Sequence, residues 1–257
     1  MIILNEKKYA EDMLKSNKIS KKPAADLYIL ARYLKQCLGM SKTESYDKLE
    51  RFFSDNYKDY KPLRWQNMIE SAVKKADKPL IRELDGIWIT KVEMDVISTC
   101  DDEKKRRLLF VMLCYAKIYN SFYEKNNSWV NVPILDLFKS AKIPVRDSNY
   151  RMLTIHSLLN MRYDEKPYIA ISKKNENTNL RITFVDNDSE KVLFISDLRE
   201  LGYEYINYVK GGYKRCKECD ILFKPKGNRS VRCSKCQEKV GSELSAERGK
   251  KHRNSDM

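Results

Sequence analysis

The chain has 257 residues, a hydrophobic content of 42% and a formal net charge of +14 at pH 7. Its eight glycines and seven prolines are too few for a turn-rich β-sandwich or for long disordered tracts, and no run of eighteen apolar residues predicts a membrane span. A strongly basic chain is attracted to polyanions, so we expect nucleic acid to be the leading class of partner.

The start of the chain becomes charged after only four apolar residues, which is not the pattern of a signal peptide. Seven cysteines, four of them in a metal-binding pattern, fit a reducing compartment better than a disulfide framework. We therefore expect a cytoplasmic protein with no membrane partner. Cys37 and Cys114 lie among apolar residues and are predicted to pack as small core side chains on helices.

The first 85 residues follow helical patterns and are expected to form a helical bundle. Pro23 suits the first turn of a helix that runs to Leu38, because its fixed φ is compatible with that position. Ser41 and Glu44 have the spacing of a capping box that opens the next helix. Apolar residues recur at helical spacing over 65–73. No residue of this bundle suggests chemistry.

Residues 86–209 give a second pattern, in which helices alternate with short strands. The expected elements are a long helix after Asp101, a short strand at 129–132, a helix from Ile134 to Lys142, a helix capped by Asp147, and a hairpin of Tyr168–Ser172 with Leu180–Val185. This order resembles a winged helix-turn-helix domain. The resemblance implies that the third helix enters the major groove of DNA and that the hairpin wing contacts the backbone or the minor groove.

The third helix of this pattern has polar residues at its beginning that suit base recognition. Arginine can pair with guanine and asparagine with adenine. The candidate DNA contacts are Arg146, Ser148, Asn149, Arg151 and Thr154. The alternative interpretation is a solvated face, or a winged helix used for protein contact. His156 has apolar neighbours and is predicted to be a packed core residue.

The expected wing carries three candidate phosphate contacts, Lys173, Lys174 and Arg181. After it, Val192–Ile195 is strand-like, and a helix is expected to begin at Ser196 or Asp197. Gly211 and Gly212 then mark a hinge into the last part of the chain.

Two Cys-x-x-Cys pairs follow this hinge, Cys216 with Cys219 and Cys233 with Cys236, separated by thirteen residues. Each pair aims two sulfurs at one point, and four thiolates can surround one tetrahedral zinc ion. Such a site has no open coordination position, so Zn²⁺ would be structural. Two disulfides, a redox pair and an iron–sulfur cluster are the alternatives.

The segment Lys210–Met257 is also basic, with fourteen Lys or Arg against six Asp or Glu. Basic residues attract phosphate and could offset the negative charge of four thiolates around zinc. The candidate nucleic-acid contacts here are Lys214, Arg215, Lys224, Lys226, Arg229 and Arg232. Phe223 interrupts them. An aromatic ring can stack on an unpaired base, but we expect Phe223 to cover the metal site as a small core and leave open that the lysines only solvate it.

The cysteine segment has a recognisable order: Cys216-Lys-Glu-Cys219-Asp-Ile-Leu-Phe223-Lys-Pro, then Arg232-Cys233-Ser-Lys-Cys236, then a basic end. It resembles the zinc ribbons that close many small phage and mobile-element proteins of Gram-positive bacteria, some of which carry a winged helix. The resemblance implies DNA binding in replication or regulation. Asp220 stands where these ribbons usually have glycine, so the first tight turn is expected to differ.

Sequence motifs of enzymes are missing. The chain has no Gly-x-x-x-x-Gly-Lys-Ser/Thr loop and no Gly-x-Ser-x-Gly elbow, and its two histidines, His156 and His252, lack metal-pair spacing. We therefore expect no catalysis. A metal-dependent nuclease built from dispersed carboxylates stays open as an alternative, because such sites leave little local trace.

These patterns predict a mainly α protein with small β elements, an α+β fold. The predicted domains are a helical bundle at 1–85, a winged-helix domain with a helical extension at 86–209, a zinc ribbon at 210–240 and a disordered basic tail at 241–257. The expected function is binding of double-stranded DNA, as a replication organiser or transcription regulator of a phage or mobile element. The main alternative is a phage-type protein that binds and inhibits or redirects a host protein machine.

Overall fold

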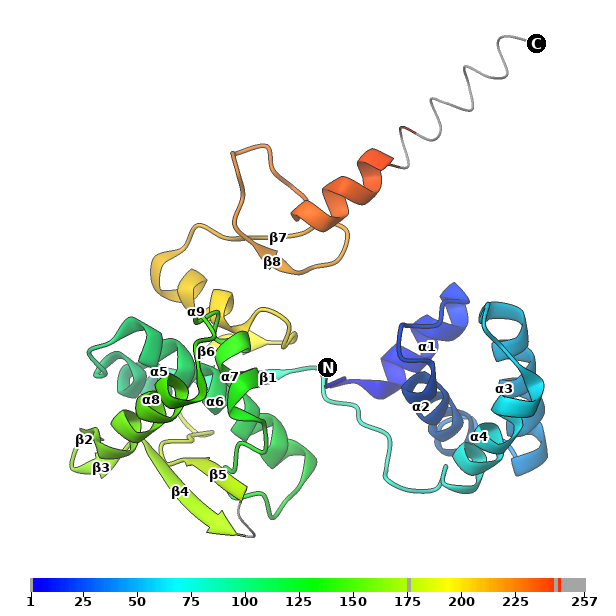
Figure 1. Cartoon of the computed structure of the whole chain (residues 1–257), viewed down its shortest axis with the longest axis horizontal. Coiled ribbons are helices and arrows are strands. Elements are labelled where there is room, and N and C mark those ends of the chain that lie inside the picture. The colour runs from blue at the N-terminus through cyan, green and yellow to red at the C-terminus, as the bar shows by residue number, and fades with distance from the viewer. Residues whose placement is uncertain (1, 175–176, 243–244, 246–257) are drawn as a thin grey trace. The chain divides into compact units, whose positions relative to one another are not determined.

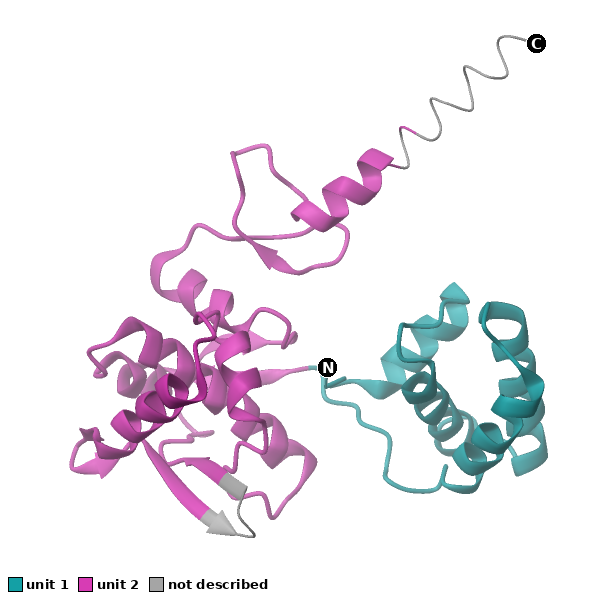
Figure 2. Cartoon of the chain, viewed as in Figure 1, with its two compact units in different colours: residues 1–85 teal, residues 86–257 magenta. Residues whose placement is uncertain are grey.

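The computed structural model describes residues 2–174, 177–242 and 245. The chain divides into two compact units, Met1–Asp85 and Gly86–Met257 (Figure 2). Helices predominate, and the strands of the described residues pair in small two-stranded antiparallel sheets, which is an α+β fold (Figure 1). None of the helices in this part of the chain is long and apolar enough to cross a membrane. The predicted basic tail at 241–257 falls largely outside the described residues.

The first unit is built from α1 (Glu6–Ser16), α2 (Pro23–Gln36), α3 (Lys42–Asn56) and α4 (Pro62–Lys74). Local signals in the sequence set where these helices begin. Pro23 and Pro62 stand in the first turn of their helices. The predicted capping box of α3 is confirmed, since Ser41 Oγ accepts the Glu44 N–H at 3.2 Å and the Glu44 carboxylate accepts the Ser41 N–H at 2.8 Å.

The four helices enclose a single hydrophobic core. Its fully buried members include Leu27, Leu30, Leu34, Phe53 and Ile69, and the ring of Trp65 packs on Phe53 with centroids 5.1 Å apart. The chain after α4 returns across this core, held by Gln36, whose side chain donates to Ala76 O at 2.7 Å and accepts from the Ile81 N–H at 2.8 Å. Cys37 is only half-buried, so the prediction that it packs in a core is met in part.

The second unit follows after Gly86. Its elements are β1 (Ile87–Thr90), α5 (Lys91–Ser98), α6 (Glu103–Phe122), α7 (Ile134–Ser140), α8 (Ser148–Asn160), β2 (Arg162–Tyr163), β3 (Lys166–Pro167), β4 (Ile169–Lys174), β5 (Asn177–Ile182), β6 (Lys191–Ile195), α9 (Leu201–Lys210), β7 (Lys214–Arg215) and β8 (Leu222–Phe223).

Helix α6 forms the centre of this unit. Every residue from Leu108 to Ile118 is buried, because α5, α7, α9, β1 and β5 all contact the helix. Cys114 lies in this stretch and is fully buried, as predicted. A helix that is enclosed all round needs few polar positions along its middle, which explains why its apolar pattern is wider than one stripe.

One charged side chain, Lys117, lies inside the enclosed part of α6. Its Nζ is 2.8 Å from Glu93 Oε1 and donates to Asp186 O at 2.6 Å. The Glu93 carboxylate also accepts the backbone N–H groups of Thr90 at 2.8 Å and Asp186 at 2.9 Å. A buried ion pair is stable only when its remaining hydrogen-bonding capacity is satisfied in this way. The pair therefore connects α5, α6 and the segment that leads into β6.

Strands β1 and β6 pair antiparallel, with Ile87 opposite Ile195, although they lie far apart in the sequence. The predicted strand at 129–132 is wrong as a strand: only an isolated bridge joins Trp129 to Arg181. The residues around Trp129 interrupt an extended conformation, because Asn127, Ser128 and Asn131 all have positive φ.

Helix α8 begins where the sequence predicts, with Asp147 accepting the Tyr150 N–H at 2.8 Å. His156 is exposed on this helix, so the prediction that it is a core residue is wrong. Its neighbours Ile155 and Leu158 are buried, but successive helical side chains are about 100° apart and His156 faces the other way.

Helix α9 begins at Leu201 and not at Ser196 or Asp197, so the predicted start is wrong. Asp197 does not cap the helix, because its carboxylate accepts the backbone N–H of Arg199 at 2.8 Å and also binds the Arg199 guanidinium. Gly202 then lets α9 approach the end of α7 closely, since a Cβ at this position would lie 2.6 Å from the backbone of Ala141.

Candidate functional site

The last part of the second unit, residues 210–242, contains the cysteines and is called the cysteine module below. Strands β7 and β8 pair antiparallel in it, with Lys214 opposite Phe223. The first cysteine pair occupies the turn between these strands, where the Cys216 N–H donates to Ile221 O at 2.9 Å. The second pair spans the start of a helix whose described part covers 234–242.

Asp220 completes the first cysteine turn with a left-handed backbone, at φ 56°. Its N–H donates to Cys216 O at 2.8 Å. Glycine favours this conformation, and aspartate is among the few other residues that adopt it regularly. The residue that departs from the usual glycine therefore still takes the left-handed conformation of a tight turn.

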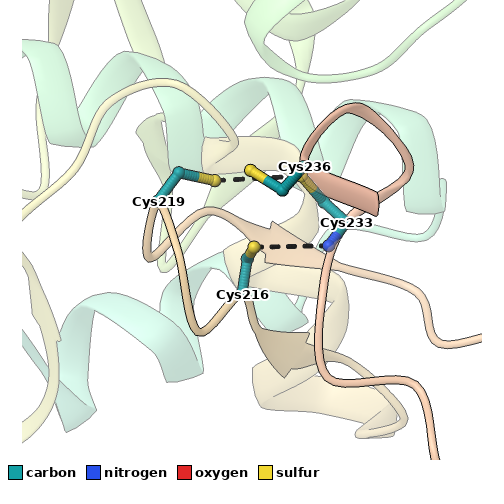
Figure 3. A group of neighbouring side chains, drawn as sticks. All are labelled: Cys216, Cys219, Cys233 and Cys236. Atoms are coloured by element: carbon teal, nitrogen blue, oxygen red, sulfur yellow. Dashed lines mark hydrogen bonds between the residues drawn. The ribbon is translucent and has the colours of Figure 1, made fainter. Parts of the chain in front are cut away.

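The four cysteine sulfurs converge on one point (Figure 3). All four Sγ atoms lie within 4.8 Å of one another, and Cys219 Sγ is 3.8 Å from Cys233 Sγ. A disulfide would need a separation of about 2.05 Å, and all four cysteines are free. The four side chains form a tetra-cysteine arrangement that can hold a metal ion. Cys216 and Cys233 are buried, whereas Cys219 and Cys236 are half-buried.

The protonation of the cluster is uneven. Burial opposes ionisation of Cys216, but backbone N–H groups of Cys233, Glu218 and Cys219 favour its thiolate and lower its pKa to about 6. Hydrogen bonds to the sulfurs of Cys219 and Cys233, aided by burial, raise the pKa of Cys236 to about 12. Four thiols at this distance cannot all ionise without a cation between them, because their charges repel.

The cysteine module is attached to α9 and the residues before it by polar and aromatic contacts. The guanidinium of Arg215 lies 2.7 Å from the buried carboxylate of Glu204, and Arg199 donates to Cys219 O at 3.0 Å. The rings of Tyr203 and Tyr213 pack with centroids 5.1 Å apart. Burial raises the pKa of Glu204, and the charge of Arg215 opposes that rise. Arg215, a predicted nucleic-acid contact, is therefore engaged in holding the module to α9.

Two other predicted contacts of the module also have protein partners. Arg232 Nε lies 2.9 Å from Glu218 Oε1, and Lys214 Nζ donates to Asn228 O at 2.8 Å. Lys224, Lys226 and Arg229 are exposed, and their side chains have no hydrogen bond or ion pair with the described residues. Of the six predicted contacts in the module, these three are free to bind an anion.

An open groove of about 720 Å³ lies between α9 and the cysteine module and is called the basic groove below. Its cationic lining residues are Lys224, Lys226, Arg229, Arg232 and Lys235. Tyr203, Tyr213 and Phe223 supply aromatic surface. The groove has one carboxylate, Glu200, which is paired with Lys142 at 2.7 Å. Phe223 is half-buried in this lining, so the prediction that it packs as a small core residue is met in part.

The exposed face of α8 differs in part from the predicted one. Ser148 and Asn149 are exposed in its first turn, and Arg146 just before it is exposed over the ring of Tyr150, 5.0 Å from the centroid. Arg151 and Thr154 are half-buried and bonded to backbone carbonyls of Arg146 and Tyr150. The exposed stripe along the helix consists of Asn149, Leu153, His156 and Asn160.

The predicted wing contacts lie on the β4–β5 hairpin. The Arg181 guanidinium is half-buried beside Trp129, 6.0 Å from the ring centroid. Lys173 and Lys174 pair through their backbones with Thr178 and Asn177. Their side chains lie outside the described part of the chain. Helix α8 and the hairpin therefore belong to one unit, in which α8 contacts β4.

The basic groove and the contacts that form it could not be predicted from the sequence. Glu204, Tyr203 and Tyr213 have ordinary helical or loop patterns, and only the fold brings them against the cysteine module. The sequence does contain one indication for Tyr203. Together with Tyr205 and Tyr208 it forms a series of aromatic residues shortly before Gly211.

Comparison of the chain with protein-family models, with curated proteins and with solved structures finds no match. Any functional conclusion must therefore be built from the residues and their geometry.

Proposed function

We propose that the protein binds double-stranded DNA through its second unit, with α8 as the recognition helix and the β4–β5 hairpin as the wing of a winged helix-turn-helix. The observation that carries this proposal is the exposed start of α8, from Arg146 to Asn149. It presents Arg146, Ser148 and Asn149 to solvent, after the short helix α7 and before the hairpin. These side chains have the donors and acceptors that read base edges in the major groove.

Electrostatics support the same partner. The chain carries a formal net charge of +14. The cysteine module adds exposed cations without protein partners at Lys224, Lys226 and Arg229. Phosphate contacts of this kind position a protein on DNA without reading its sequence. In this proposal α8 selects the site, and the cysteine module increases the affinity.

The metal that best fits the cysteine cluster is Zn²⁺ in a structural zinc ribbon. A tetrahedral ion with Zn–S bonds of about 2.3 Å separates its sulfurs by about 3.8 Å. Cys219 and Cys233 have a sulfur separation of 3.8 Å. An iron–sulfur cluster holds its cysteine sulfurs farther apart, so the geometry favours a single ion. The zinc would have no open position for a substrate, and its contribution would be to the stability of the module.

The biological role proposed for this DNA binding is that of a replication organiser or transcription regulator of a phage or mobile element, acting in the cytoplasm of a bacterial host. The support is the resemblance of the cysteine segment and its basic end to the ribbons of such proteins. The particular operator follows from the experiment below.

The test is duplex binding by the metal-loaded full chain across a salt titration, with random and genomic DNA fragments in competition. Each phosphate contact contributes about −0.9 to the slope of log K against log salt. We expect a steep slope and enrichment of selected fragments. Arg146→Ala and Asn149→Ala should each cost about 1–3 kcal/mol on an enriched fragment and relax its selection.

Arg64→Ala is the matched control, because it removes one exposed positive charge from α4 in the first unit. It should leave fragment selection unchanged. If the Arg146 and Asn149 variants select and bind fragments as the Arg64 variant does, α8 is not the recognition helix. A steep salt slope without enrichment would also contradict the sequence-reading part of the proposal.

A second candidate function, binding to a protein partner, is favoured by apolar residues at the same surface. Leu153 on α8 is 68% exposed, and Val145 before the helix is 45% exposed. Exposed apolar side chains mark a protein interface where they gather into one patch. Under this alternative the chain would bind no duplex at moderate salt, and Leu153→Ser would abolish capture of a protein partner.

A further inference from the structure

The basic groove combines cations, which the double-stranded DNA proposal uses as phosphate contacts, with an aromatic surface that this proposal does not use. Its volume of about 720 Å³ lies in the range of small-ligand pockets, about 300–1,000 Å³. It is formed by α9, by the residues around β8 and by the segment that leads to Cys233. The occupant must therefore fit between a helix and the cysteine module.

The charge of the groove specifies an anion. Five cationic residues line it, and its one carboxylate, Glu200, is already paired with Lys142. Arg232 is partly neutralised by Glu218, but Lys224, Lys226 and Arg229 have no protein partner among the described residues. Several unpaired cations on one concave surface are the arrangement that tracks a phosphate backbone.

The aromatic residues specify what the anion must carry. Tyr203 and Tyr213 pack on each other, with ring planes inclined by 31°. Phe223 is half-buried in the groove, and its ring has no aromatic partner within the described residues. A flat ring that is accessible next to unpaired cations can stack on a planar base.

These features distinguish an unpaired strand from a duplex. The bases of a duplex are stacked on one another, so a ring recessed in a groove cannot reach their faces. A single strand can turn its bases outward and place them on an aromatic surface while its phosphates meet the cations.

We infer that the basic groove binds single-stranded nucleic acid, with Phe223 stacking on a base and Lys224, Lys226 and Arg229 contacting the adjacent phosphates. DNA and RNA share the chemistry that the groove recognises, a phosphodiester backbone with unpaired bases. The inference does not depend on α8, because no residue of that helix lines the groove.

The cysteine cluster has a direct part in forming this site. Phe223 stands in β8, directly after the first cysteine turn, and Cys233 itself lines the groove. A metal ion that fixes the four cysteines would therefore also fix the position of the aromatic ring and of the cations beside it.

The experiment measures fluorescence anisotropy of labelled oligothymidylate, oligouridylate and a blunt duplex of equal length with the metal-loaded full chain. Phe223→Leu keeps an apolar side chain over the cysteine turn but removes the stacking face. It should weaken single-strand binding about 5- to 150-fold, and Phe223→Tyr should bind like the unmodified protein. Metal content must be the same in all variants.

A triple variant with Lys224→Gln, Lys226→Gln and Arg229→Gln tests the cations. It leaves the apolar residues of the module unchanged. Loss of three phosphate contacts should reduce the single-strand salt slope by about 2, at about 0.7 per contact. Lys217→Gln is the control, because Lys217 is an exposed lysine of the same module that does not line the groove.

The outcomes separate this inference from the duplex proposal. Arg146→Ala should alter duplex selection and leave oligothymidylate binding unchanged, whereas Phe223→Leu should do the reverse. Equal single-strand affinity of Phe223→Leu and Phe223→Tyr would overturn the stacking contact. A triple variant with the same salt slope as Lys217→Gln would overturn the groove as the binding site, and so would equal affinity for polyglutamate, which has charge but no bases. Preference for oligothymidylate or oligouridylate would identify DNA or RNA as the source.

Discussion

The helical bundle of the first unit and the cysteine module of the second reach a defined fold by different means. The bundle encloses a core in which Leu27, Phe53 and Ile69, among others, are inaccessible to solvent. In the described residues 210–242, only Cys216, Leu222 and Cys233 are buried. Two of these three are candidate metal ligands. The bundle is therefore held by apolar burial, whereas the module has almost none.

This difference indicates where each part should fail. A segment of this size without a hydrophobic core is not stable alone, and a structural metal can contribute about 10–16 kcal/mol to its folding. The bundle depends on side-chain packing, where each large core residue contributes a few kcal/mol. Metal removal should thus affect the module alone, and core truncation the bundle alone.

The largest effect is expected from Cys233→Ser. Loss of one of four thiolates should release the metal ion and unfold the cysteine module, because the metal supplies most of its stability. We expect loss of bound zinc by elemental analysis and loss of amide-exchange protection in the module, with protection in 1–85 unchanged. Cys37→Ser is the control, since Cys37 belongs to the first unit and is half-buried there. If Cys233→Ser retained its full metal content, the proposal that the four cysteines bind zinc would be wrong.

The next effect is expected from Phe53→Ala in the bundle. Phe53 is completely buried and packs against Trp65, so truncation should destabilise the first unit by about 3–5 kcal/mol. Amide-exchange protection of 1–85 during urea denaturation measures the bundle, and metal analysis measures the cysteine module. Leu63→Ala, at a position that is 91% exposed, should change stability by less than about 0.5 kcal/mol. A metal content that falls in Phe53→Ala would contradict the independence of the two parts.

A smaller effect is expected from Arg215→Gln, which tests how the module is attached. Removing this charge leaves Glu204 buried without its partner and should cost about 1–3 kcal/mol. Arg232→Gln breaks the more exposed pair with Glu218 and should cost at most about 1 kcal/mol. Thermal unfolding of the metal-loaded protein compares the two variants.

The Arg215→Gln prediction has a defined pH dependence. Burial raises the folded-state pKa of Glu204 above its unfolded value, and loss of Arg215 should raise it further. A raised carboxyl pKa means that the folded state binds the proton more tightly, so stability falls as pH rises from the ordinary glutamate pKa through the folded one. The cost of Arg215→Gln should therefore be greatest at neutral pH and smaller in acid. A cost that grows on acidification would contradict the role given to Glu204.

The smallest effect is expected from Ser41→Ala at the start of α3. Ser41→Ala removes the capping hydrogen bond and should cost about 1 kcal/mol. Ser41→Gly should cost only about a few tenths of a kcal/mol. Hydrogen bonds from Ser41 lower the pKa of Glu44, so the contribution of the capping box should be present above the ordinary glutamate pKa and be lost as pH falls. Circular dichroism during urea titration at two pH values measures this. Equal stability of the alanine and glycine variants would contradict the capping role of Ser41.

Local features of the fold could be predicted from the sequence because nearby residues determine them. The predicted capping box of Ser41 with Glu44 forms, and Asp147 caps α8 as predicted. The spacing of the four cysteines likewise predicts that they cluster, and they do. The capping partners are close in sequence. The cysteines must come together because one metal ion would bind all four.

Features that depend on residues far apart in the chain could not be predicted. The pairing of β1 with β6 and the burial of Glu204 under Arg215 arise only after the second unit has folded. The predicted start of α9 is too early, because Asp197 binds Arg199 and does not cap the helix. The apolar neighbours of His156 in the sequence predict a buried side chain, but the direction in which the helix turns it makes it exposed.

The contacts between α9 and the cysteine module have a consequence for avidity. Gly211 and Gly212, both at positive φ, would by themselves form a flexible tether. Arg199 and Arg215 fix the module on either side of that tether. A second binding surface that is fixed in place acts at a high effective concentration for one ligand geometry and at almost none for others. The module and α8 should therefore act together only on a nucleic acid whose shape reaches both, for example a duplex next to an opened strand.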